Sequence, residues 1–81
     1  MTVKVLFFAS CRDLIGERER RVILPEGATV RDLIAEVSSE HASFAAMAPS
    51  LMVSVNQDYV DRVAVLKEGD EVAFIPPVSG G

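Results

Sequence analysis

The sequence has only one cysteine, Cys11, among its 81 residues. A lone cysteine cannot form a disulfide within the chain, so the fold must be stabilised by packing, as is usual in reducing compartments. The sequence also lacks an apolar run close to the roughly 20 residues needed to span a bilayer. Its N-terminus lacks the basic segment, hydrophobic stretch and small-residue cleavage site of a secretion signal. These absences predict a cytoplasmic protein without a membrane partner.

Basic residues are also few, since 8 Lys and Arg stand against 12 Asp and Glu, and the formal net charge is −4. The only basic group is formed by Arg18, Arg20 and Arg21. Binding to a phosphate backbone requires a concentrated basic face, so we expect no nucleic-acid partner. His41 is the only histidine, and no neighbouring cysteine or carboxylate pattern completes a metal site. No nucleophile and base are arranged for catalysis, so the chain is not expected to be an enzyme by itself.

What the sequence does contain is apolar material for one domain. Eighty-one residues allow one core and no second, and 49% of them are hydrophobic while 25% are charged. The strongest helix signal starts at Thr29, which forms a capping-box pattern with Asp32 ahead of apolar residues at helical spacing. Shorter helical turns are expected at residues 10–16 and 43–49. β-branched and aromatic runs predict strands at residues 3–9, 20–24, 51–55 and 71–75, with a hairpin arm at 59–60.

The order of these elements predicts an α+β fold. A hairpin, a helix and a returning strand require a right-handed crossover, which places the first and last strands side by side and parallel in the centre of the sheet. That arrangement is the β-grasp fold of ubiquitin, a mixed sheet of about five strands with one main helix packed across one face. We expect residues 1–77 to form this domain and residues 78–81 to form a flexible C-terminal tail.

The tail ends in Ser79-Gly80-Gly81 and follows the proline pair Pro76-Pro77. Such an ending is by default an ordinary frayed terminus. It can also be a reactive end, because a carboxylate becomes electrophilic when ATP adenylates it, and the last residues must then thread a narrow channel. Glycine suits such a channel because it lacks a Cβ, and the prolines supply a stiff base. The residues alone leave both interpretations open.

The C-terminal sequence also resembles a known family. Residues 69–81 (GDEVAFIPPVSGG) are similar to the C-terminal signature of the small subunit of molybdopterin synthase. Residues 3–10 (VKVLFFAS) and the turn at 55–57 match the pattern of that family too, so the resemblance runs from end to end.

The resemblance implies a mechanism in which an adenylating enzyme, related to ubiquitin-activating enzymes, uses ATP to convert Gly81 to an acyl-adenylate. A sulfurtransferase then replaces AMP by sulfur, so the chain carries a covalent thiocarboxylate and no permanently bound cofactor. The tail, with Gly80, Ser79 and Val78 as its stalk, enters a pocket of the large subunit, and its sulfur attacks cyclic pyranopterin monophosphate. Two such transfers build the dithiolene of molybdopterin, in a heterotetramer of two small subunits on a large-subunit dimer.

One sheet face of a β-grasp domain has no helix over it and must be solvated or covered by a partner. Along the first strand Phe7 alternates with Leu6 and Phe8, so either Phe7 or that pair points away from the helix. The family resemblance favours Phe7, Tyr59 and Ile75 as a docking patch for the large subunit and the adenylating enzyme. The alternative is that all three belong to the core.

Three other functions stay open. A sulfur carrier of the same fold would serve thiamin or cysteine biosynthesis, although the PPVSGG ending argues by resemblance against the thiamin type. A ubiquitin-like modifier would form isopeptide bonds with lysines of target proteins. A plain interaction domain would carry an inert tail.

Overall fold

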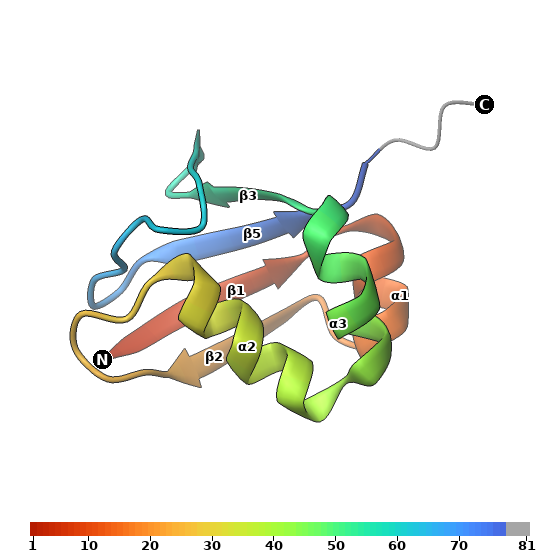
Figure 1. Ribbon diagram of the computed structural model, residues 1–81, viewed down its shortest axis with the longest axis horizontal. Coiled ribbons are helices and arrows are strands. Elements are labelled where there is room, and N and C mark those ends of the chain that lie inside the picture. The colour runs from red at the N-terminus through yellow and green to blue at the C-terminus, as the bar shows by residue number, and fades with distance from the viewer. Residues whose placement is uncertain (78–81) are drawn as a thin grey trace.

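A mixed sheet of five strands, in the order β2-β1-β5-β3-β4, forms one layer of the molecule (Figure 1). The structure is a computed structural model and describes residues 1–77. Its strands are β1 (Thr2–Phe7), β2 (Glu19–Ile23), β3 (Met52–Val55), β4 (Asp58–Tyr59) and β5 (Glu71–Ile75). Its helices are α1 (Ala9–Ile15), α2 (Val30–Glu40) and α3 (Ala42–Met47), followed by the 3₁₀ turn η1 (Ala48–Ser50).

The two central strands, β1 and β5, run parallel although they come from opposite ends of the described chain. Their register pairs Leu6 with Ala73 and Phe7 with Phe74. Strand β2 pairs antiparallel with the other side of β1, and β3 pairs antiparallel with the other side of β5. The predicted β-grasp arrangement, with the first and last strands adjacent in the middle of the sheet, is therefore confirmed.

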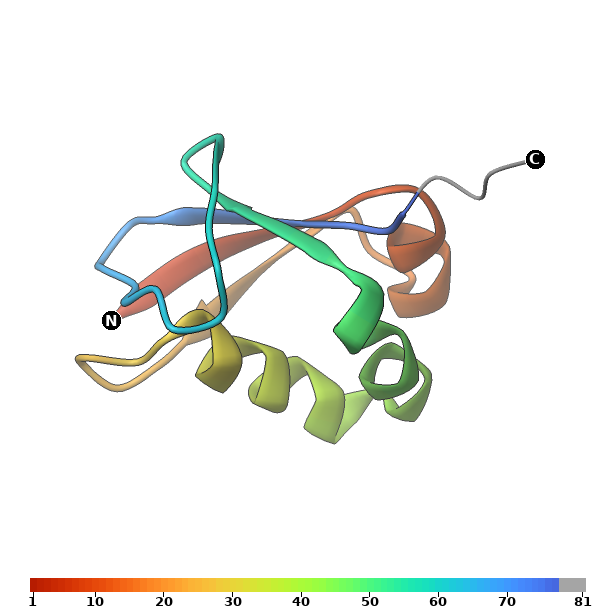
Figure 2. The same cartoon turned by 45° about the horizontal axis from the view of Figure 1, so that its top comes forward.

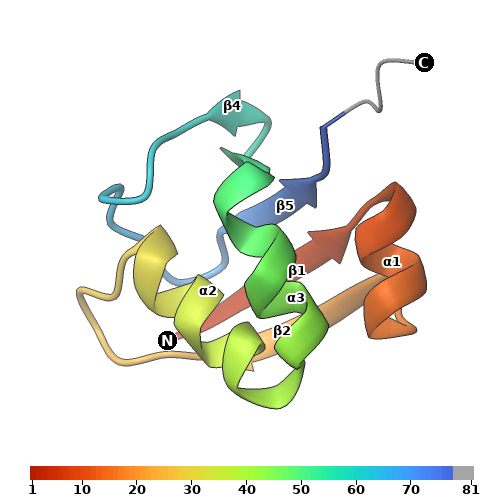
Figure 3. The same ribbon diagram turned by 45° about the vertical axis from the view of Figure 1, so that its right-hand side comes forward.

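The longest helix, α2, begins where the capping box predicts it. The Thr29 hydroxyl accepts a hydrogen bond from the Asp32 amide at 3.3 Å, and the Asp32 carboxylate accepts one from the Thr29 amide at 2.9 Å. Figure 2 shows α2 and α3 together under one face of the sheet. The other face therefore has no helical cover in the described residues, while α1 lies at the end of the sheet where β1 and β5 finish (Figure 3).

Three buried phenylalanines join the sheet to the helical layer: Phe7 of β1, Phe74 of β5 and Phe44 of α3. The ring centroids of Phe44 and Phe74 are 5.3 Å apart, and those of Phe7 and Phe44 are 6.3 Å apart, both in edge-to-face geometry. This geometry brings the positive edge of one ring to the negative face of another and stabilises the pair beyond its buried area. The cluster fixes α3 beside α2 on the covered face.

The structure corrects one detail of the sequence prediction. The first strand ends at Phe7 and not at residue 9, because Phe8 is the N-cap of α1 and Ala9 turns the chain with a φ of 47°. The prediction of one main helix with shorter helical turns is confirmed, since α2 is the longest helix and α1 and α3 have 7 and 6 residues. Gly16 ends α1 in the left-handed conformation that is common at helix C-termini.

The hairpin between β3 and β4 turns on two residues with positive φ, Asn56 at 51° and Gln57 at 74°. A glutamine in this conformation costs about 1 kcal/mol, because its Cβ approaches the backbone, and glycine avoids that cost. Gln57→Gly should therefore raise the free energy of unfolding by about 1 kcal/mol and the Tm by roughly 4–8 °C in thermal denaturation. A variant no more stable than the parent would contradict this turn geometry.

Asn56→Gly is the matched control for that substitution. The Asn56 side chain donates to the Asp70 carboxylate at 3.0 Å and accepts from the Glu71 amide at 3.0 Å. Because glycine removes both hydrogen bonds, this variant should be less stable than the parent chain.

Candidate functional site

The base of the predicted reactive tail lies at one end of the sheet. Strand β5 is followed by Pro76 and Pro77, the last described residues. The Phe8 amide, at the end of β1, donates to the Phe74 carbonyl at 3.2 Å. Strand β5 therefore ends beside the point where β1 turns into α1 (Figure 3). Four predicted site residues lie outside the described residues: Val78, Ser79, Gly80 and Gly81.

The outer face of the sheet, away from α2 and α3, changes character along the strands. Paired residues of neighbouring strands point to the same face and form rows. One row is charged: Lys4 pairs with Arg21 and Glu71 in register, and the Lys4 ammonium lies 3.7 Å from the carboxylate of Glu19 and 3.8 Å from that of Glu71. The outer face therefore carries a charged row at Lys4, farther from Pro77 than the rows described next.

The rows nearest Pro77 are mostly apolar. In one row Leu6 pairs with Ala73, and Ala73 pairs with Ser54, which pairs in turn with Tyr59. In the next row Met52 pairs with Ile75. Phe8, which follows Phe7 in the chain, is beside Ile75 by the same parallel register. We call these side chains the apolar patch: Leu6, Phe8, Met52, Tyr59, Ala73 and Ile75.

The larger members of the apolar patch are exposed. Phe8 and Met52 are each 47% exposed and Tyr59 is 66% exposed. Burying a large apolar side chain contributes about 1.5–3 kcal/mol, because apolar surface is removed from water. Exposed apolar groups that adjoin one another mark a surface that can bind another protein. The geometry therefore supports a docking surface next to Pro77.

The prediction that Phe7 belongs to the docking patch is wrong. Its side chain is 3% exposed and packs in the aromatic cluster with Phe44 and Phe74. Tyr59 and Ile75 do lie on the outer face, Tyr59 exposed and Ile75 half-buried. Docking through these two residues stays a prediction.

Sequence reasoning did not select four members of the patch: Leu6, Phe8, Met52 and Ala73. The two-residue alternation of β1 allows either Phe7 or the pair of Leu6 and Phe8 to face outward. The residues of β1 are apolar on both faces near its end, so the phase of the alternation is not visible there. Thr2 and Lys4 are polar and lie on the same face as Leu6. These two residues were the signal that Leu6 and Phe8, and not Phe7, point outward.

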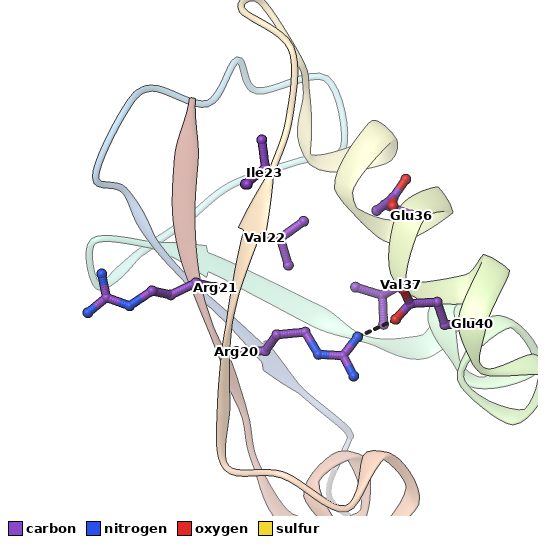
Figure 4. A pocket seen from close by; sticks show the side chains of 7 residues that line it. All are labelled: Arg20, Arg21, Val22, Ile23, Glu36, Val37 and Glu40. Carbon is purple, nitrogen blue, oxygen red and sulfur yellow. Dashed lines mark hydrogen bonds and ion pairs between the residues drawn. The ribbon is translucent and has the colours of Figure 1, made fainter.

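A hollow of about 260 Å³ lies between β2 and α2. Figure 4 shows the Arg20 side chain reaching toward Glu40, while Arg21 points the other way. Arg20 Nε also lies 3.0 Å from Glu17 Oε2, and the hydrogen bond to Glu40, followed by that to Glu17, raises the pKa of the Arg20 guanidinium. The charge of Arg20 is thus paired within the chain, and the contact ties the edge strand to the helix.

Cys11 is a buried thiol, and His41 lies between two helices. The Cys11 thiol is buried, with its sulfur 3.4 Å from that of Met47, and burial raises the pKa of the thiol. A reactive cysteine needs the opposite shift, because the thiolate is the nucleophile. His41 ends α2 and precedes α3.

The described residues offer neither a metal-binding cluster nor a membrane-spanning helix. Residues 1–77 contain no group of three or more His, Cys, Asp or Glu side chains that could hold a metal ion. None of the helices in the same range is long and apolar enough to cross a membrane. The cytoplasmic location expected from the sequence stays a prediction.

Known proteins resemble this chain over its whole length. The family model of the ThiS family matches residues 5–81. The molybdopterin synthase sulfur carrier subunit of Chlamydomonas reinhardtii is 42% identical over 84 residues, which cover all of both chains. A Pyrococcus furiosus structure described as molybdopterin converting factor, subunit 1, has 40% identity and a TM-score of 0.87, over 96% of this chain and 99% of its own. The Haloferax volcanii small archaeal modifier protein 1 has 26% identity and a TM-score of 0.85 over both full chains.

The opposite environments of Phe7 and Phe8 predict opposite effects of the same truncation. Phe7→Ala should lower the free energy of unfolding by about 3–5 kcal/mol, because it leaves a cavity in the aromatic cluster. Phe8→Ala should cost less than about 1 kcal/mol, because its side chain is half in water already. Urea denaturation of both variants measures the difference. Equal losses would contradict the assignment of the two residues to opposite faces.

Proposed function

This chain belongs to the ThiS family, and from that premise we propose that it is the sulfur-carrier subunit of molybdopterin synthase in molybdenum cofactor biosynthesis. The observation that carries the proposal is the 42% identity with the Chlamydomonas reinhardtii sulfur carrier subunit over the full length of both chains. Gly80 and Gly81 are the glycine pair on which such chemistry depends.

In the proposed cycle the chemistry takes place at the carboxyl group of Gly81. A carboxylate oxygen attacks the α-phosphorus of ATP on the adenylating enzyme, pyrophosphate leaves, and an acyl-adenylate forms. A sulfur nucleophile at the oxidation level of sulfide, supplied by a sulfurtransferase, then displaces AMP and leaves a thiocarboxylate. Its sulfur attacks cyclic pyranopterin monophosphate, and two such donations supply the two sulfurs of the dithiolene.

In this proposal the chain is a protein substrate and carries no catalytic apparatus. Its one thiol is buried with a raised pKa, and the described residues hold no cluster that could bind a catalytic metal. The acids and bases of the transfer would therefore come from the large subunit, whose pocket receives Val78, Ser79, Gly80 and Gly81. Glycines at the end suit that entry because they have no Cβ to clash with the pocket walls.

We propose that the apolar patch is the surface by which the large subunit holds the chain while the tail is inserted. The patch adjoins Pro76, so a partner that covers it also lies close to the start of the tail. The adenylating enzyme would use the same surface, since it must receive the same carboxyl group. In the complete enzyme, two copies of this chain would bind a dimer of large subunits.

A second candidate function is protein modification, which the resemblance to the Haloferax volcanii modifier favours. An activated Gly81 would then be attacked by a lysine amine of a target protein and form an isopeptide bond. High-mass conjugates of the chain that survive reducing agent in cell extracts would support this function over sulfur transfer.

Charge placed in the apolar patch should weaken docking without unfolding the chain. Phe8→Asp and Tyr59→Asp should each reduce the affinity for the large subunit by at least about tenfold, because a buried unpaired carboxylate is strongly disfavoured. Isothermal titration calorimetry measures the affinity. The matched control is Ile23→Asp, at an 80% exposed apolar residue at the far end of the same face. A loss for Ile23→Asp as large as for Phe8→Asp would contradict docking through the patch.

Incubation with the adenylating enzyme, ATP and a sulfurtransferase should change the mass of the chain. The intact mass should rise by the difference between sulfur and oxygen, because one carboxylate oxygen is exchanged. A chain lacking Gly81 should show no change. Enzymes that are active on another carrier but leave this chain unaltered would contradict the sulfur-carrier proposal.

A further inference from the structure

A cavity of about 280 Å³ lies at the edge of the apolar patch, on its β2 side. Leu6 and Phe8 belong both to the patch and to the wall of the cavity. The Phe7 amide donates to the Arg18 carbonyl at 2.9 Å, which places Arg18 beside the end of β1. The cavity and the base of the tail therefore lie at the same end of the sheet, the end where α1 is seen in Figure 3.

Two arginines line this cavity, Arg12 from α1 and Arg18 from the segment between α1 and β2. Both residues are exposed. Among residues 1–77, Arg18 has no carboxylate within 4.0 Å. The carboxylate nearest to Arg12 is that of Asp13, whose Oδ1 lies 4.0 Å from Arg12 Nε and whose side chain is 79% exposed. A contact of that length between solvated groups contributes little. The two positive charges are therefore largely available to a partner.

The other charges near the cavity do not neutralise these arginines. Glu19 also lines the cavity, but its carboxylate lies 3.7 Å from the Lys4 ammonium. Arg20, the next arginine along β2, is held by Glu17 and Glu40 on the covered side of the strand. On a chain with a net charge of −4, Arg12 and Arg18 are thus two exposed cations in the cavity wall that are not closely paired with a carboxylate.

We infer that this cavity is an electrostatic extension of the docking surface and receives an aspartate or glutamate side chain of the large subunit of molybdopterin synthase. The inference rests on the proposed function. The apolar wall of Leu6 and Phe8 would pack against the methylene groups of the acidic side chain. The guanidinium groups of Arg12 and Arg18 would donate hydrogen bonds to its carboxylate, a contact stronger than one between neutral groups.

The physical role of this contact is to select and orient the partner. A charged pair at the rim of an apolar interface mainly increases the association rate and rejects partners of the wrong charge. Because the cavity lies on one side of the patch only, it also breaks the symmetry of an otherwise featureless apolar surface. The large subunit would then bind in the single orientation that brings its pocket to the tail.

The test is the salt dependence of binding between the complete chain and the purified large subunit, measured by surface plasmon resonance. Arg12→Glu and Arg18→Glu should each weaken binding by roughly fivefold to tenfold at low salt, mainly through slower association, and the two effects should add in the double variant. In about 1 M salt, where charges are screened within a few ångströms, the variants and the parent chain should bind almost equally.

Arg31→Glu is the matched control. Arg31 is exposed on α2, on the opposite side of the molecule, and its substitution by glutamate changes the net charge by the same amount. It should change the affinity by less than about twofold. The neutral variants Arg12→Gln and Arg18→Gln should change the logarithm of the affinity about half as much as the corresponding glutamate variants. Thermal denaturation of each variant verifies that it is folded.

Several outcomes would overturn the inference. Reversal variants that bind like Arg31→Glu at low salt would show that the cavity receives no carboxylate. A loss that persists in high salt would show that packing and not charge was damaged. Variants that lose affinity for the adenylating enzyme but keep their affinity for the large subunit would show that the cavity binds the adenylating enzyme instead. If the parent chain did not bind the large subunit, both the proposed function and the inference would be wrong. If the parent chain bound the large subunit and the arginine variants bound it equally well, only the inference would be wrong.

Discussion

The parallel pairing of β1 with β5 is the constraint on which the rest of the structure depends. It brings the two ends of the described chain together in the middle of the sheet, with Phe7 opposite Phe74. That register puts both rings into the core, where Phe44 of α3 completes the cluster. Because side chains alternate along a strand, the same register turns Leu6, Phe8, Ala73 and Ile75 to the opposite face. A shift by one residue would exchange the two sets and would bury the charged groups of Lys4 and Glu71.

The unequal faces of the sheet follow from the small size of the chain. With 81 residues, it builds one helical layer and leaves the second sheet face without cover in the described residues. Its cysteine is buried, and the outer face of its sheet carries the apolar patch. What it can offer is a surface and a terminus. The proposed function uses both, since a partner held on the apolar patch lies next to Pro76 and Pro77, from which the reactive segment continues.

Local sequence signals predicted much of this fold, and tertiary packing decided the remainder. The capping box at Thr29 and Asp32 and the strand at residues 71–75 appear where they were predicted, because each depends on neighbours in the chain. The outward direction of Phe8 could not be read from residues 3–9, since the apolar residues at the end of that run allow both phases of the alternation. The approach of Arg12 and Arg18 to Leu6 and Phe8 depends on how α1 folds back against the sheet, which no local pattern encodes. The family resemblance supplied the prediction of a reactive glycine, and the burial of Phe7 and the exposure of Phe8 then replaced Phe7 by Phe8 in the proposed docking surface.

The most direct test of the account is a single-turnover reaction that joins the two proposed roles, surface and terminus. Purified chain carrying the Gly81 thiocarboxylate would be mixed with the large subunit and cyclic pyranopterin monophosphate, and molybdopterin would be measured after oxidation to its fluorescent derivative. The account predicts that molybdopterin forms with two thiocarboxylates consumed for each product, and that the carboxylate form of the chain yields none. A thiocarboxylated chain that binds the large subunit but forms no molybdopterin, while its sulfur passes to an acceptor of thiamin or cysteine biosynthesis, would contradict it.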